Sequence, residues 1–146
     1  MTRKKVIVWA AALVAVSLIP VPYLASPEWH VQVVDESGKP LQGMTVRIEH
    51  KNYSVETRGH EEDRLTDEHG DVVFPKHTRS ASTLRRCIFT ALSATAFAHA
   101  SFGPHAYVFA FGKGLEGDAL SGDIVTDWSG QLARMDSRIV AKQVFQ

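Results

Sequence analysis

The sequence contains a single cysteine, Cys87, which excludes an intramolecular disulfide and a zinc site built from paired cysteines. A lone cysteine in an exported protein is typically buried and inert, and we expect this of Cys87. The alternative is a reactive thiol, because the neighbouring Arg85 and Arg86 supply the electropositive setting that favours a thiolate.

The sequence also lacks an excess of charge of either sign, since Lys and Arg together number 16 and so do Asp and Glu. A protein that binds nucleic acid typically carries a basic stripe, so the composition argues against a nucleic-acid partner. The length of 146 residues leaves room for one domain beside a targeting segment.

Motifs of the common catalytic classes are missing as well. The chain has no His-Glu-x-x-His for a zinc peptidase and no Gly-x-Ser-x-Gly for a hydrolase nucleophile. Gly112-x-Gly114 follows an expected strand but opens no helix, so it is not a nucleotide-binding loop. The sequence therefore predicts no catalytic residue and no cofactor, and we expect that the protein is not an enzyme.

Histidines are the remaining candidate metal ligands, because the chain has seven of them. His99 and His105 flank the turn at 101–104 and could approach each other. A zinc site needs three or four ligands, and no cysteine or carboxylate lies beside this pair in the sequence. His99 and His105 are therefore weak metal candidates, and capping or core positions are the expectation for both.

Two aspartate-containing stretches suggest calcium loops, the first around Asp67 and Asp71 and the second around Asp118 and Asp123. Neither stretch has the regular spacing of oxygen ligands and the terminal glutamate of an EF-hand. We expect ordinary turns at both places and no bound metal.

The N-terminus has the pattern of an export signal. Arg3, Lys4 and Lys5 precede an uncharged apolar run over 6–19 that continues less strongly to residue 25. The positive end should stay in the cytoplasm, with the rest of the chain outside.

A cleaved signal peptide and a retained anchor are both compatible with this segment. A cut after Ala25 would place Tyr23 at the outer recognition position, where a small residue is preferred, and a cut after Ser26 would place Leu24 there. We therefore favour a signal anchor or transmembrane helix over residues 1–26. The domain over 27–146 would then lie in the periplasm or another extracytoplasmic space.

Short alternating runs separated by turn residues follow this segment, which predicts a mainly β, antiparallel sandwich. Met44, Val46 and Ile48 alternate with polar residues, so we expect them to face the core. We expect the same of Tyr107, Phe109 and Phe111 on a later strand. Two last strands are expected over 124–128 and 137–142, and the charged stretch 58–66 is expected to be a loop.

One helical insertion is predicted at about 80–102. Leu84, Ile88 and Leu92 fall at helical spacing, and Ser80 or Ser82 can cap the helix. Residues 87–112 contain no Asp, Glu, Lys or Arg, so a dip into a membrane is the alternative. We favour a core helix followed by a core strand, because His99, Ser101, Pro104 and His105 interrupt the apolar span.

Two stretches carry a resemblance to a known family. They are the run 30–35 followed by Gly38-Lys39-Pro40-Leu41, Gly43 and 46–48, and the run 66–67 followed by 70–74. The chain here resembles the start of a carboxypeptidase regulatory-like (prealbumin-like or transthyretin-like) β-sandwich of exported bacterial proteins. The resemblance implies an accessory cell-envelope domain without catalytic activity. The related ureide hydrolases end in Tyr-Arg-Gly-Ser, whereas this chain ends Gln143-Val144-Phe145-Gln146, so their activity is not implied.

Aromatic side chains are the remaining candidates for ligand contact. Trp29, Tyr53 and Trp128 would form a platform for a carbohydrate or peptide if exposed, and Tyr53 is the strongest candidate because Trp128 is expected in the core. The leading hypothesis is a non-enzymatic, membrane-tethered domain that binds or positions an envelope protein or glycan. The alternative is a metal-dependent envelope enzyme that uses His99, His105 and a distant carboxylate.

Overall fold

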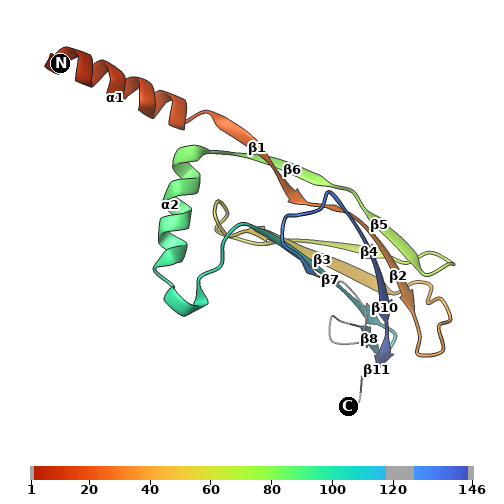
Figure 1. The fold of residues 1–146 in the computed structure, drawn as a ribbon. Helices are drawn as coiled ribbons and strands as arrows, with labels where there is room; N and C mark the ends of the chain where they lie inside the picture. Colours follow the sequence, from red (N-terminus) through yellow and green to blue (C-terminus); the bar gives the residue numbers. More distant parts are fainter. Residues whose placement is uncertain (1, 118–126, 145–146) are drawn as a thin grey trace.

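The computed structural model describes residues 2–117 and 127–144, and the chain is mainly β. Its elements are, in order, α1 (Arg3–Ser17), β1 (Pro20–Ser26), β2 (Glu28–Val34), β3 (Thr45–Asn52), β4 (His60–Leu65), β5 (Asp71–Phe74), β6 (His77–Ser82), α2 (Thr83–Ala94), the 3-10 turn η1 (Phe97–His99), β7 (Pro104–Gly112), β8 (Leu115–Gly117), β9 (Asp127–Trp128), β10 (Arg134–Val140) and β11 (Lys142–Gln143). The sheets form the body, and α1 and α2 extend from one end of it (Figure 1).

The strands form open, largely antiparallel sheets, as predicted. One sheet has the order β10-β2-β5 and the other the order β11-β8-β7-β3-β4, with β9 also beside β7. A separate two-stranded ribbon joins β1 to β6. The pairing of β10 with β2 is parallel, which differs from the purely antiparallel arrangement expected. Of the strand expected over 124–128, residues 127–128 form β9. Residues 124–126 lie outside the described residues.

The core lies between the two larger sheets. Its largest fully buried side chains are Trp29 and Phe74 from one sheet, Ile48 from the other, and Met44, which directly precedes β3. On β3 the even-numbered residues from 46 to 52 are all buried, and the intervening ones are half-buried. The prediction that Met44, Val46 and Ile48 face inward is therefore confirmed.

The predicted orientation of β7 is wrong. Ala106, Val108 and Ala110 are buried, whereas the aromatic residues at 107, 109 and 111 lie on the outer face of the sheet. Val108 pairs with Ile48 of β3, so small side chains line the interior where Trp29 and Phe74 already fill the space. Because successive residues of a strand point to opposite faces, this register turns all three aromatic residues outward.

The charged stretch 58–66 is also different from its prediction, since it contains strand β4 rather than only a loop. Each residue of β4 pairs with a residue of β3, from Thr45 opposite Leu65 to His50 opposite His60. Charged side chains are accepted here because they form cross-strand ion pairs, including Arg47 with Asp63.

The N-terminal segment does not form the expected helix of about 20 residues. Helix α1 ends at Ser17, and 20–26 form a strand that pairs with β6. At 1.5 Å per residue, α1 is about 22 Å long, which is shorter than the bilayer core of about 30 Å. Among the described residues, no helix has both the length and the apolar character needed to span a membrane.

Helix α2 is present as predicted and is capped by Ser82, whose side chain accepts the backbone N–H of Arg85 at 3.3 Å. Its expected place in the core is wrong, because none of its residues is buried. Cys87 is exposed, which contradicts the expectation that it is buried. Of the stretch 87–112, for which a membrane dip was the alternative, residues 104–112 form β7, which lies inside a sheet between β3 and β8.

Candidate ligand-binding face

The outer face of β7 carries a row of aromatic rings. This aromatic row comprises Tyr53, His105, Tyr107, Phe109 and Phe111. Ring centroids are 6.0 Å apart between Tyr107 and Phe109, and 5.7 Å apart between Phe109 and Phe111. The ring of Tyr53 meets that of His105 edge-on at 5.6 Å. The row exists because alternate residues of one strand share a face and Tyr53 follows the neighbouring strand.

Polar groups of β3 hold the row in place. The Tyr107 hydroxyl donates a hydrogen bond to the Glu49 carboxylate, and the two residues are cross-strand partners. This hydrogen bond, together with partial burial, raises the pKa of Tyr107 to about 12. The ammonium group of Lys51 lies 4.8 Å from the ring centroid of Tyr53. The Tyr107 hydroxyl and the Tyr53 ring are thus each held by a side chain of β3.

Arg47 fixes the other end of the row. Its guanidinium lies 5.5 Å from the ring centroid of Phe111 and donates to both carboxylate oxygens of Asp63, at 2.7 and 2.8 Å. A further ion pair joins it to Glu61 at 3.0 Å. The hydrogen bond from Arg47 lowers the pKa of the Asp63 carboxyl below its usual value. The aromatic row therefore has an ordered border of charged side chains on β3 and β4.

A cleft of about 430 Å³ lies at the Tyr53 end of the aromatic row. Its lining includes Glu49, Lys51, Tyr53, Glu61, Tyr107 and Asp127. Glu61 pairs with Arg47, and the remaining Glu49 and Asp127 outnumber Lys51, so the cleft favours a positively charged group.

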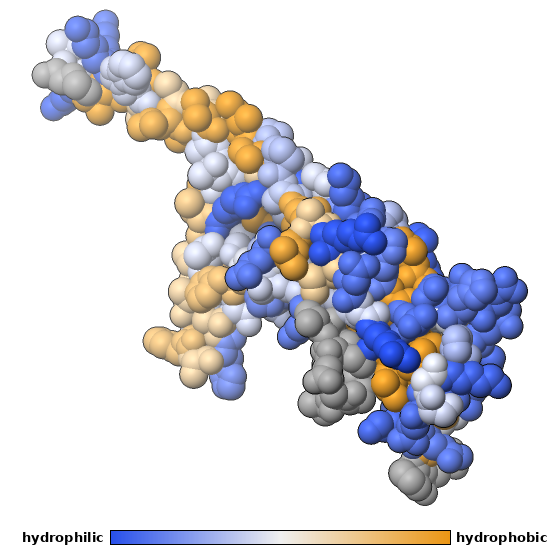
Figure 2. All heavy atoms as spheres, turned by 45° about the vertical axis from the view of Figure 1, so that its right-hand side comes forward, coloured by the Kyte–Doolittle hydropathy of each residue, from blue (hydrophilic) through white to orange (hydrophobic). Residues whose placement is uncertain are grey.

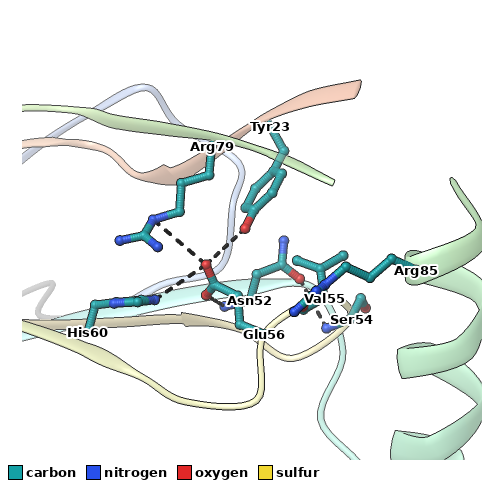
Figure 3. Close-up of polar contacts among 8 residues, drawn as sticks. All are labelled: Tyr23, Asn52, Ser54, Val55, Glu56, His60, Arg79 and Arg85. Atoms are coloured by element: carbon teal, nitrogen blue, oxygen red, sulfur yellow. Dashed lines mark hydrogen bonds and ion pairs between the residues drawn. The ribbon is translucent and has the colours of Figure 1, made fainter. Parts of the chain in front are cut away.

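The loop that carries Tyr53 is held by a carboxylate at its base (Figure 3). The Glu56 side chain accepts a hydrogen bond from the backbone N–H of Asn52 at 2.7 Å and another from the Tyr23 hydroxyl at 2.9 Å. Arg79 and His60 lie 3.8 and 3.6 Å from the oxygen that Tyr23 contacts. Burial and the contact with Glu56 raise the pKa of Tyr23 to about 12. Glu56 thus joins the β1–β6 ribbon to the loop.

Helix α2 and the start of β7 also contact this loop. The Arg85 side chain donates to the Val55 carbonyl at 2.7 Å (Figure 3), and the Ser93 hydroxyl donates to the Tyr53 carbonyl at 3.1 Å. The backbone N–H of Tyr53 donates to the Gly103 carbonyl at 2.9 Å. Three parts of the molecule therefore determine where the Tyr53 ring lies.

A stack of three histidines lies on the other side of β3 and β4. The buried ring of His50 stacks between those of His60 and His77, with centroids 5.2 and 5.7 Å away. Burial, with a contribution from the charge of His60, lowers the pKa of His50 to about 4, so His50 is neutral at neutral pH. His77 contacts Glu62 at 3.1 Å. Within 2–117 and 127–144, no group of three His, Cys, Asp or Glu side chains is arranged to hold a metal ion.

The structure places the sequence-predicted residues in different environments. His99 ends η1, whereas His105 lies on β7, contacts the carbonyl of Phe102 at 3.1 Å and belongs to the aromatic row. Trp29 and Trp128 are buried in the core, so they form no exposed platform. The outward orientation of the β7 aromatic residues was not predicted from the sequence, although they alternate strictly with small residues.

The candidate calcium turn around Asp67 uses its carboxylate internally. One carboxylate oxygen of Asp67 accepts the backbone N–H groups of His69 and Asp71, at 2.8 and 2.9 Å. The hydrogen bond from the N–H of Asp71 is the main cause that lowers the pKa of Asp67. The second candidate pair, Asp118 and Asp123, lies outside the described residues.

Comparisons with known proteins assign no family. No family model matches the chain, and no curated protein matches it. Among solved structures, the chain is similar to 3-chlorocatechol 1,2-dioxygenase from Rhodococcus opacus 1CP, with a TM-score of 0.45 and 15% sequence identity. The match covers 82% of this chain and 62% of the dioxygenase chain. A likeness at this level assigns neither fold nor activity.

Proposed function

We propose that this protein is a non-enzymatic, membrane-tethered domain of the cell envelope that binds an envelope protein through the aromatic row. The domain belongs, in this proposal, to the carboxypeptidase regulatory-like or prealbumin-like β-sandwiches. The observation that carries the proposal is the row of aromatic rings on the outer face of a sheet.

The chemistry of the row favours a protein partner over a glycan. Aromatic residues and arginine are enriched at protein interfaces, where they contribute most of the binding energy. Tyr107, Phe109 and Phe111 stack on one another, so their ring faces are partly covered and mainly their edges are offered. A sugar ring stacks on an open aromatic face, whereas apolar side chains of a protein pack against ring edges as well.

Charge in the cleft beside the aromatic row indicates which side chain the partner presents there. Glu49 and Asp127 outnumber Lys51 in the lining, so a lysine or arginine of the partner fits there beside the apolar contact. The partner that the proposal describes therefore presents a small apolar patch next to a basic side chain.

The tether in this proposal is α1. Its apolar side chains are exposed, none of its residues is buried, and basic residues stand at its start. Retention of the segment after export is supported by β1, which pairs with β6 and buries Ala25 and Ser26. A cut at either residue would remove this strand and the Tyr23 contact with Glu56.

The test is quantitative recovery of partners from detergent-solubilised membranes by the tagged full-length chain. The double variant Tyr107→Ser/Phe109→Ser removes the centre of the aromatic row. Its matched control is Val73→Ser, an exposed apolar residue on the outer face of the other sheet. We expect one envelope protein whose recovery falls at least about tenfold in the double variant, which corresponds to about 1.4 kcal/mol, and is unchanged in the control.

Three outcomes would contradict the proposal. Equal recovery with the double variant and the control would remove the aromatic row as the binding face. Recovery of a glycan in place of a protein would change the class of partner. Stoichiometric zinc that His99→Ala removes from the purified protein would favour the alternative, a metal-dependent enzyme.

A further inference from the structure

Helices α1 and α2 leave the same end of the β1–β6 ribbon. Pro20, at the start of β1, pairs with Ser82, at the end of β6. Helix α1 ends at Ser17, and α2 begins at Thr83, directly after this pair. Figure 1 shows both helices at this end of the molecule, with α2 beside the end of β3 and β7. A surface that receives α1 therefore lies close to the start of α2.

The side of α2 that faces the domain is held there by hydrogen bonds. Arg85 and Ser93 contact the carbonyls of Val55 and Tyr53, as described above. Arg86 donates to the carbonyl of Val21 at 3.4 Å. These contacts fix the helix on the domain, while Leu84, Ile88 and Leu92 remain exposed.

A neighbouring side of α2 is apolar and exposed. Leu84, Ile88 and Leu92 are spaced four residues apart and form one stripe, with exposed fractions of 39, 48 and 59%. Beyond the helix, Phe97 in η1 is 87% exposed. Figure 2 shows apolar residues along α1 and on the lobe below it, which α2 and η1 form.

The charges on α2 indicate which surface would cover this stripe. Arg85 and Arg86 are its charged residues, and no Asp or Glu occurs between residues 83 and 112. A helix with an apolar face, flanking arginines and no acidic residue binds the interface of a bilayer that contains anionic lipid. The ring of Tyr23 lies 5.1 Å from the Arg86 guanidinium, which keeps this cation beside the junction with α1.

We infer that α2 and η1 form an interfacial membrane contact, with Leu84, Ile88, Leu92 and Phe97 in the headgroup–acyl boundary of an anionic bilayer. The inference rests on the proposed membrane attachment of α1, which holds α2 at a high effective concentration near the lipid surface. It adds a second contact that orients the domain, so that the Tyr53 loop bonded to α2 has a fixed height above the membrane.

Cys87 makes this contact measurable in the full-length protein, because it is the only cysteine of the chain and lies exposed on α2. Cys87 is labelled with an environment-sensitive fluorophore, and the protein is added to vesicles of phosphatidylcholine with or without phosphatidylglycerol. The matched control carries the label at the exposed turn residue 36, in the double variant Glu36→Cys/Cys87→Ser. Lipids with a nitroxide near the headgroup report whether each label lies at the interface.

We expect the label on Cys87 to shift to the blue and to lose most of its fluorescence to the nitroxide lipid in vesicles with phosphatidylglycerol. The label at residue 36 should stay in water. Introducing Ile88→Asp and Leu92→Asp should abolish the shift at Cys87, while sedimentation of the protein with vesicles through α1 persists.

The outcomes separate this inference from the proposed tether. A vesicle-bound protein whose Cys87 label remains in water overturns the α2 contact and leaves the tether standing. Failure of the wild type to sediment with vesicles overturns the tether and the inference together. A label that is shielded without lipid, together with Cys87–Cys87 dimers on oxidation, would assign the stripe to a second copy of the chain.

Discussion

The two-sheet body and the helical end of this protein place apolar side chains in opposite environments. In the body, Trp29, Phe74 and Ile139 are fully buried, whereas no residue of α1 or α2 is buried. Both regions are apolar in sequence, so hydropathy by itself does not determine burial. The body is covered by its own second sheet, whereas the apolar side chains of the helical end are exposed.

The same contrast occurs within β7. Its small residues Ala106, Val108 and Ala110 are buried, and the larger aromatic residues between them are at the surface. A large side chain on an outer face contributes to stability through its neighbours on that face and remains available for a partner. Size and hydropathy therefore do not identify the inner face when both faces of a strand are apolar.

The largest expected effect comes from the centre of the core. Phe74→Ala should lower the free energy of unfolding by about 3–5 kcal/mol, because transfer free energy is lost and a cavity is left. Leu92→Ala, on the exposed stripe of α2, should change it by less than about 0.5 kcal/mol. Urea unfolding of the two variants measures the difference. Similar losses would mean that α2 packs on the domain.

His50 should make stability depend on pH. Its pKa is about 4 in the folded protein and 6.5 as the ordinary value, so the unfolded chain takes up a proton between these pH values and the folded chain does not. The shift corresponds to a contribution of about 3 kcal/mol to the free energy of unfolding. This contribution is present above pH 6.5 and is lost as the pH falls toward 4.

Urea unfolding at a series of pH values measures this loss, and the His50→Leu variant is the control. The variant should lack the part of the pH dependence between 6.5 and 4. Glu62 and Asp63 have lowered pKa values and therefore affect stability mainly below about pH 4.5, through loss of their own ion pairs. An unchanged slope in the variant would contradict the neutral, buried state of His50.

A smaller effect is expected on the outer face of β7. Phe109→Ala removes two ring contacts, with Tyr107 and Phe111, and should lower the free energy of unfolding by about 1–2 kcal/mol. Thermal melts beside Phe74→Ala compare an outer with an inner aromatic residue. Equal losses would show that a second layer covers the aromatic row.

A small effect is also expected for Arg47→Ala, at less than about 1 kcal/mol, because exposed ion pairs contribute little. The difference from the wild type should shrink further at high salt. A loss that is larger and independent of salt would mean that Arg47 acts through packing on Phe111 rather than through Asp63.

Local patterns predicted part of this fold. The alternation at Met44, Val46 and Ile48 identified an inner face, because its neighbours are polar. The helical spacing after Ser82 and the cap itself were also predicted. Where both faces of β7 are apolar, alternation did not reveal which set turns inward. Whether the apolar stripe of α2 is buried or exposed depends on distant elements, so its exposure was not predictable from the helical spacing.

The candidate site was predictable at one residue and not as a whole. Tyr53 was proposed as a platform from its residue type, but its partners come from β3 and β7, and the Tyr23–Glu56 contact joins positions 33 residues apart in sequence. Strand β4 was not predicted because its residues are mostly charged. These charges are compatible with a strand because side chains such as Arg47 and Asp63 form ion pairs across β3 and β4. Such long-range pairings leave no local signal.

The most direct test of the proposed binding face is photo-crosslinking in cells that express the full-length chain. A photoreactive phenylalanine analogue replaces Phe109 in the aromatic row or, as the control, Val73 on the outer face of the opposite sheet. We expect one discrete protein adduct from position 109 and none from position 73. Absence of an adduct at 109, or the same adduct from both positions, would contradict the aromatic row as the surface that binds an envelope protein.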